Sequence, residues 1–337
     1  MTRGRIVALI LLAVFTAYAI ITLLPRGNNF DAENPTMSTT DLPILIAHGG
    51  GNREFPDNTL EAFYNAYSVS ENVMMETDVS ITKDGVVILS HDTTIDRKTN
   101  KTGAIADWNY SDLIAERVDF GYTNPTVSQQ LNGDRVKFKN EKGVEVTPLD
   151  VDYPDGVTAR DPEVFLATTL EELLDAFPNN LVNVEIKQSG ELGIKCLDEI
   201  IRIVDERDAY GRVVLASFHN EIYDEFCAHK ACGELPESFM YSPGTGGVIK
   251  YYLLMTLGLD IFFRDGIAVL QLPTDEYGIK LSTKRLVKNA HKHNIAVHYW
   301  TVNDKDEMRE LISIGADGIM TDYPHRLAEV YAEYQKQ

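Results

Sequence analysis

Cysteine is scarce in this chain, whose 337 residues include only Cys196, Cys227 and Cys232. Three scattered cysteines are too few for a disulfide framework, and no Cys/His spacing indicates structural zinc. Basic charge is also in deficit, because 31 Lys and Arg face 51 Asp and Glu, for a formal net charge of −20. This balance argues against nucleic acid as a partner, since no basic stripe is available to neutralise phosphates.

Charged residues are absent from Ile6 to Leu24, an apolar run near the start of the chain. As a helix it would extend roughly 28 Å, close to the hydrocarbon thickness of a bilayer. A cleaved signal peptide is the alternative, but the run exceeds an ordinary signal core, and Leu24-Pro25-Arg26 offers no small-residue cleavage site. We therefore predict a transmembrane anchor at residues 1–26.

The flanks of this run predict its orientation. Arg3 and Arg5 precede it, whereas Arg26 alone follows, with Asp31 and Glu33 just beyond. The positive-inside rule places the N-terminus in the cytoplasm and the rest of the chain outside it, in the periplasm or the extracellular space. Residues 27–41 are polar, with Gly, Asn, Pro and Ser, and are typical of a tether.

The remaining residues, 42–337, alternate short β-branched runs with helical patterns. We expect eight strands, at 44–48, 73–81, 181–187, 212–218, 238–242, 267–272, 295–302 and 317–321. Helices are expected at 59–68, 170–177, 191–206, 221–229, 281–293, 304–314 and 324–334. Eight strands alternating with helices predict an α/β fold of the (β/α)8 TIM barrel type. An open doubly wound sheet is the alternative, but no Gly-rich dinucleotide loop follows the first strand.

One polar segment, at about residues 107–161, interrupts this alternation between the second and third strands. It is rich in Gly, Asn, Asp and Pro and has no long apolar period. We interpret it as an insertion on the catalytic rim of the barrel, with a structureless loop as the alternative.

Acidic residues on two of the expected strands suggest a metal site. Side chains alternate along a strand, so Glu76 and Asp78 share a face, and on the next strand Glu185 shares a face with Lys187. Inward carboxylates repel one another unless a cation lies between them. Oxygen ligands favour Ca2+ or Mg2+. A structural Glu185–Lys187 ion pair is the alternative for the second strand.

Two histidines stand at the ends of strand patterns, where barrel enzymes place their catalytic groups. His48 closes PILIAH and precedes three glycines, and His91 closes GVVILSH. Either alone is more often structural. Together with a carboxylate cluster, they are typical of a general acid and a general base.

The order of motifs resembles that of the glycerophosphodiester phosphodiesterase family. IAHGG, PDNTLEAF and METDVSITKDGVVILSHDTTIDRKTNKTG carry the resemblance, and TTLEELLDAFP, VEIK, LASF, HYWTVND and GADGIMTDYP continue it to about residue 330. Agreement is weak in the insertion and in residues 220–280.

The resemblance implies a role for each matching residue. His48 and His91 would be the acid/base pair, and the metal ligands would be Glu76, Asp78 and Glu185. Substrate contacts would come from Lys187, a cation near the phosphate, and Trp300, an aromatic wall, while His298 on the same strand face either lines the pocket or packs. Two positions depart from the family pattern. Gly49 replaces a phosphate-holding Arg, for which Arg53 is a candidate substitute, and Asp57 replaces Glu.

The expected activity is metal-dependent hydrolysis of small glycerophosphodiesters to sn-glycerol 3-phosphate and an alcohol. One alternative is a lysophospholipase D, favoured by the anchor. Apolar segments at 251–255 and 261–263 would offer it an apolar rim, but ordinary helix and core packing is the favoured interpretation of these segments. A further alternative, suggested by Gly49, is a weakly active barrel that only binds phosphodiesters. The sequence predicts no particular oligomeric state.

Overall fold

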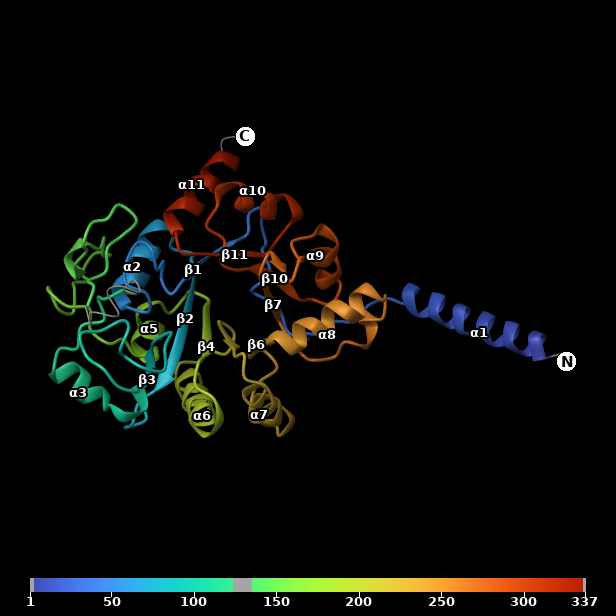
Figure 1. Ribbon diagram of the computed structural model, residues 1–337, viewed down its shortest axis with the longest axis horizontal. Coiled ribbons are helices and arrows are strands. Elements are labelled where there is room, and N and C mark those ends of the chain that lie inside the picture. Colours follow the sequence, from blue (N-terminus) through green and yellow to red (C-terminus); the bar gives the residue numbers. More distant parts are fainter. Residues whose placement is uncertain (1–2, 124–134, 336–337) are drawn as a thin grey trace.

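Eight parallel strands form the centre of the molecule in the computed structural model, which describes residues 3–123 and 135–335 (Figure 1). Their order is β6-β5-β4-β2-β1-β11-β10-β7. A backbone hydrogen bond of 3.1 Å from Ala268 to Tyr241 connects the two outer strands, so the sheet is a nearly closed barrel. The strands are β1 (Ile44–His48), β2 (Met74–Ile81), β4 (Val182–Ile186), β5 (Val213–Ala216), β6 (Met240–Ser242), β7 (Val269–Leu272), β10 (Ala296–Tyr299) and β11 (Gly318–Thr321). Each lies within a predicted strand, and the predicted fold class is confirmed.

Helices cover the outside of this barrel, as expected for βα units. They are α2 (Leu60–Val69), α5 (Leu170–Ala176), α6 (Gly190–Glu206), α7 (Asn220–Ala231), α8 (Thr245–Thr256), α9 (Lys284–His291), α10 (Lys305–Ile314) and α11 (Pro324–Tyr334). Thr59 and Thr169 accept hydrogen bonds from the first turns of α2 and α5, and so fix where these helices begin. The sequence patterns predicted all of these helices except α8.

The insertion follows an extra strand, β3 (Val87–Leu89), which pairs antiparallel with β2. It contains α3 (Tyr110–Ala115), while its residues 124–134 lie outside the described residues. The backbone N–H of Glu141 donates to the Arg53 carbonyl at 3.1 Å, and Arg326 pairs with the Glu141 carboxylate at 2.9 Å. The insertion therefore lies against the loop that follows β1 and the first turn of α11.

Alternation along the strands separates two apolar cores. Val73, Met75 and Val79 belong to the large core between sheet and helices. Met74 faces the barrel interior, where it belongs to a smaller core with residues such as Ile46. The interior is thus apolar at the amino ends of the strands, which leaves the polar inward residues at the carboxyl ends.

The segment after the first helix packs against the base of this barrel. Phe30 is 2% exposed and belongs to the interior core. Arg26 forms a buried ion pair with Asp260, at 2.8 Å from Nε to Oδ2. Asn34 donates to the carbonyls of Ala268 and Asn294 at 2.7 and 2.9 Å. Polar composition predicted a tether here, and the structure adds that its polar groups bond to the barrel.

The first helix, α1 (Arg3–Leu23), projects away from the barrel (Figure 1). It is long and apolar enough to cross a membrane, and its most apolar window contains no buried residue. A signal sequence near the N-terminus has the same properties.

Candidate active site

Three acidic side chains from two adjacent strands meet at the carboxyl end of the barrel. Glu76 and Asp78 lie on β2, and Glu185 lies on β4, where the register pairs it with Asp78. One carboxylate oxygen of each residue lies within 4.8 Å of the others. Glu76 and Asp78 are each only 3% exposed. The structure thus brings together the three residues that the sequence suggested as metal ligands.

The loop after β1 holds the two β2 carboxylates in place. The backbone N–H of Gly49 donates to Glu76 Oε2 at 2.8 Å. Asn58, in the left-handed region with φ of 60°, donates from Nδ2 to Asp78 Oδ2 at 3.1 Å. Its Oδ1 accepts from Thr77 Oγ1 at 2.7 Å. These bonds orient both carboxylates toward the barrel axis.

Lys187 is the nearest cation to this cluster, with Nζ 2.8 Å from Asp78 Oδ1 and 2.6 Å from Glu185 Oε1. Burial, together with the negative charge of Asp78, raises the pKa of Glu76 to about 8. Burial also raises the pKa of Glu185, although Lys187 opposes this shift. One lysine therefore does not neutralise the cluster, and a divalent cation would stabilise the ionised form of all three carboxylates.

His48, the last residue of β1, is oriented by a carboxylate that the sequence reasoning did not identify. Its Nδ1 lies 2.6 Å from Asp322 Oδ1, and Asn303 donates to Asp322 Oδ2 at 2.7 Å. Burial lowers the pKa of His48, but the bond to Asp322 and the charge of Glu76 outweigh it and raise the pKa to about 9. Since Nδ1 is engaged, Nε2 is the nitrogen left for a substrate.

His91 has the same arrangement on another loop. Its Nδ1 lies 2.9 Å from Asp92 Oδ1, and Arg97 donates to both oxygens of Asp92. The bond to Asp92 raises the pKa of His91. Only their positions in the sequence could have pointed to these two carboxylates. Asp92 follows His91 directly, and Asp322 follows the last residue of β11.

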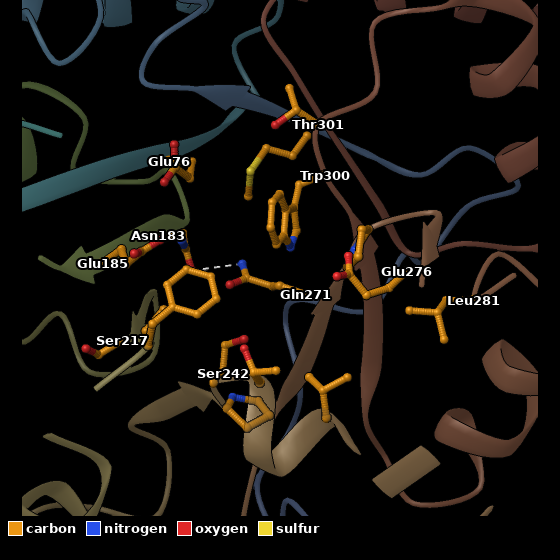
Figure 2. A pocket seen from close by; sticks show the side chains of 18 of the residues that line it. Glu76, Asn183, Glu185, Ser217, Ser242, Gln271, Glu276, Leu281, Trp300 and Thr301 are labelled. Atoms are coloured by element: carbon orange, nitrogen blue, oxygen red, sulfur yellow. Dashed lines mark hydrogen bonds between the residues drawn. The ribbon is translucent and has the colours of Figure 1, made fainter. Parts of the chain in front are cut away.

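A single cavity of about 730 Å³ contains the acidic cluster and both histidines. Figure 2 shows Glu76 and Glu185 on one side of it and Leu281 on the other, with Trp300 between them. Gln271 donates to Asn183 Oδ1 at 2.9 Å across the interior. The wall away from the carboxylates is mostly apolar and includes Phe218, Pro273, Val248, Ile249, Tyr252, Leu253, Tyr277, Ile279 and Leu281.

Of the four other residues that the sequence suggested, two line the cavity and two do not. Lys187 and Trp300 line the cavity. Arg53 is not among the residues that line it; its side chain is 62% exposed, with Nε 3.9 Å from Asp322 Oδ2. His298 is fully buried, and its Nε2 lies 2.8 Å from the Thr36 carbonyl, so it packs inside the barrel.

Gly49 has a backbone that excludes a side chain. Its φ is +54°, and a Cβ built there would lie 2.8 Å from the Asp57 Cβ. Asp57 is in turn paired with Lys98. The two departures from the expected pattern, at positions 49 and 57, are therefore in direct contact.

Comparisons with known proteins agree on one family. The model of the Glycerophosphoryl diester phosphodiesterase family matches residues 48–326. A glycerophosphodiester phosphodiesterase of Caldanaerobacter subterraneus is 26% identical over 84% of this chain and 96% of its own length. Lysophospholipase D GDPD1 of Rattus norvegicus is 26% identical over 84% of both chains.

Solved structures share the fold. A crystal structure of a glycerophosphoryl diester phosphodiesterase from Silicibacter pomeroyi has a TM-score of 0.63 at 20% identity, covering 89% of this chain and 96% of that one. An Oleispira antarctica phosphodiesterase, solved in complex with sn-glycerol-3-phosphate, has a TM-score of 0.58 at 17% identity, covering 86% and 97%.

Proposed function

This chain belongs to the glycerophosphoryl diester phosphodiesterase family, and from that premise we propose that it hydrolyses glycerophosphodiesters to sn-glycerol 3-phosphate and an alcohol with a divalent cation. The observation that carries the proposal is the convergence of three carboxylates and two carboxylate-oriented histidines in one cavity. That set contains the groups that phosphodiester hydrolysis requires.

The acidic cluster fits a divalent cation by the chemistry of its donors. Glu76, Asp78 and Glu185 offer only oxygen atoms, as Ca2+ and Mg2+ prefer. Their burial with Lys187 as the nearest cation leaves negative charge to be neutralised. When bound, the cation would offset the charge of the phosphate oxygens and make phosphorus easier to attack.

We assign the two proton transfers to His48 and His91. A water, or the free glycerol hydroxyl next to the phosphate, attacks phosphorus, and one imidazole takes its proton; attack by the hydroxyl forms a cyclic glycerol phosphate, which a water then opens to sn-glycerol 3-phosphate. The bond from phosphorus to the alcohol oxygen breaks, and the other imidazole protonates that oxygen. Asp322 and Asp92 hold each Nδ1, which keeps Nε2 available and stabilises the imidazolium form.

The cavity provides groups for positioning the rest of the substrate. We propose that Lys187 attracts the phosphate while it holds two ligand carboxylates. Trp300 provides a flat apolar wall for the glycerol or alcohol portion. Arg53 would contact the phosphate only if its exposed side chain turned inward, so we assign it a secondary role.

We further propose that α1 is an uncleaved membrane anchor and that the barrel lies outside the cytoplasm. Arg26 and Phe30, directly after the helix, are integrated into the base of the barrel. The helix itself also contacts the barrel, because Tyr18 Oη donates to the Leu257 carbonyl at 2.7 Å, which supports a helix retained in the mature protein. Arg3 and Arg5 before the helix support a cytoplasmic N-terminus.

The test is release of choline and glycerol phosphate from glycerophosphocholine by the full chain in detergent. We expect turnover with Ca2+ or Mg2+ and its loss in His48→Ala and Glu76→Ala, while the exposed-site change Asp208→Asn serves as control. Activity that survives both active-site changes, or saturable binding without turnover under either metal, would contradict the proposal.

A further inference from the structure

The carboxyl end of α8 and the short helix η3 (Asp260–Phe262) expose three large apolar side chains, which we call the α8–η3 surface. They are Leu253, Leu257 and Phe262, which are 55%, 54% and 59% exposed. Leu253 and Leu257 are one helical turn apart, so they lie on the same face of α8. Exposed apolar surfaces that group in this way usually mark a contact with another molecule or with a membrane.

This surface adjoins α1 at the last turns of that helix, and in Figure 1 α8 lies between the centre of the barrel and α1. The Leu257 carbonyl accepts a hydrogen bond of 2.7 Å from Tyr18 Oη, and a Cβ added at Gly258 would lie 3.0 Å from Thr22 Cγ2. Thr22 precedes Leu24, the end of the uncharged run, by two residues, which is roughly 3 Å at about 1.5 Å per residue. A bilayer that contains the whole run therefore also reaches the end of α8.

Polar groups at this junction bond to other protein groups. Arg26 donates to the carbonyls of Thr22, Leu24 and Gly258 at 3.4, 2.6 and 3.3 Å. Its Nε also lies 2.8 Å from Asp260 Oδ2, and both side chains are buried. Water can satisfy helix-end carbonyls at an exposed junction, but hydrocarbon cannot, so carbonyls and charges in lipid need protein partners. The junction between α1 and α8 has such partners.

The charge pattern of the same segment also favours lipid. From the start of α8 to Arg264, Asp260 is the only acidic residue, and its charge is paired with Arg26, although the whole chain contains 51 Asp and Glu. A Cβ added at Gly27 would lie 3.6 Å from Arg264 Nη1, so this guanidinium is level with the residues that follow α1. Lipid phosphates lie at that level when α1 spans the bilayer, and they attract a basic group there.

We propose that the α8–η3 surface is embedded in the bilayer beside α1, at the boundary between headgroups and acyl chains, as a second membrane contact of this chain. The inference rests on the proposed anchor and adds that the barrel is held in one orientation against the membrane. Apolar surfaces of this kind typically enter a bilayer by about 5–10 Å. A second copy of the chain is a poorer occupant, because α1 already places lipid against Leu257.

The experiment measures the depth of single fluorescent labels on the full chain in phosphatidylcholine nanodiscs. Cys227 and Cys232 are replaced by Ser, while Cys196 is buried and stays unlabelled. One new cysteine in this background then carries the environment-sensitive dye NBD. Thermal unfolding of each labelled variant verifies that it is folded, without reference to catalysis. Iodide quenches a label from the water, and lipids with a nitroxide just below the headgroup quench it from the bilayer.

The labels are compared with two controls. At Leu257→Cys and Phe262→Cys we expect iodide to quench about threefold less, and the nitroxide lipids about threefold more, than at Leu192→Cys. Leu192 is the matched control, because it is an exposed apolar residue of α6, on another side of the barrel. Leu11→Cys, in the middle of the uncharged run, is the control for the anchor and should be inaccessible to iodide.

The outcomes separate this inference from the proposed anchor. If the label at residue 11 lies in lipid but those at 257 and 262 are as open to iodide as that at 192, the inference fails and the anchor stands. If the label at residue 11 is itself open to iodide, α1 does not enter the bilayer and both fail. If labels at 257 and 262 are protected from iodide and from the nitroxide lipids alike, a second copy covers the surface and the inference is overturned.

Discussion

Replacing Asp322 by Asn tests whether a carboxylate sets the catalytic state of His48. The two groups are 2.6 Å apart, and Asp322 is the leading favourable contribution to the raised pKa of His48. A hydrogen bond to a charged group contributes about 1.5–3 kcal/mol. If Asn retains the position but not the charge, the imidazolium form loses that stabilisation in the transition state. We therefore expect a kcat about 10- to 150-fold lower.

The assay is steady-state choline release from glycerophosphocholine by the full chain in detergent, with kcat and KM determined separately. Because Asp322 contacts His48 rather than the cavity, KM should change less than twofold. Asp208→Asn, in the loop between α6 and β5, makes the same chemical change at an exposed position and should leave both constants unaltered. A kcat within twofold of wild type in correctly folded Asp322→Asn would refute the reasoning, as would a loss confined to KM.

Three further predictions concern the metal, the base of the barrel and the first loop. Chelation should abolish turnover, and Glu185→Gln should raise the Ca2+ or Mg2+ concentration needed to restore it, measured by metal titration; turnover indifferent to chelator would contradict the metal assignment. Asp260→Asn should destabilise the fold by about 3–5 kcal/mol, because it leaves Arg26 buried without its counter-charge. Burial would raise the pKa of Asp260, but the bonds from Arg26, His293 and Asn289 together outweigh it and lower the pKa. This stability is therefore present above about pH 4 and is lost at lower pH. Thermal unfolding against pH should show the acid-side slope reduced in the variant. Gly49→Arg, which restores the residue expected from the family, should lower stability by about 1–2 kcal/mol or more without raising activity, because φ is +54° and Asp57 occupies the Cβ direction; an active variant with unchanged unfolding temperature would refute this.

The sequence was sufficient for the parts of the structure that follow from periodicity. Alternation along residues 73–81 predicted the inward face of β2, and Glu76 and Asp78 do lie together in the barrel interior. The same parity placed Glu185 next to them, because residues paired on neighbouring parallel strands lie at the same level along the barrel, and Glu185 is paired with Asp78. Local sequence patterns are informative here because the side chains of a strand alternate between its two faces.

Local sequence patterns did not predict features that depend on contacts between distant segments. Helix α8 was not predicted, because it begins at Gly-rich residues and combines one buried with one exposed apolar face, which blurs the 3.6-residue period. Asp322 is 274 residues from His48, so only the closure of the barrel brings it to the imidazole. A phosphate contact from Arg53 was predicted from its place in the first loop, close in sequence to His48. Closeness in sequence does not determine where a flexible side chain points, and that of Arg53 is 62% exposed.

The packing of Phe30 under the barrel has a practical consequence for preparing this enzyme without its helix. A chain that starts at residue 42, where the βα pattern begins, would lack Phe30, whose side chain is 2% exposed. The apolar core inside the barrel would then be open to water. Loss of a buried Phe commonly costs about 3–5 kcal/mol. A water-soluble version should instead start before Arg26, so that it keeps both Phe30 and the ion pair between Arg26 and Asp260.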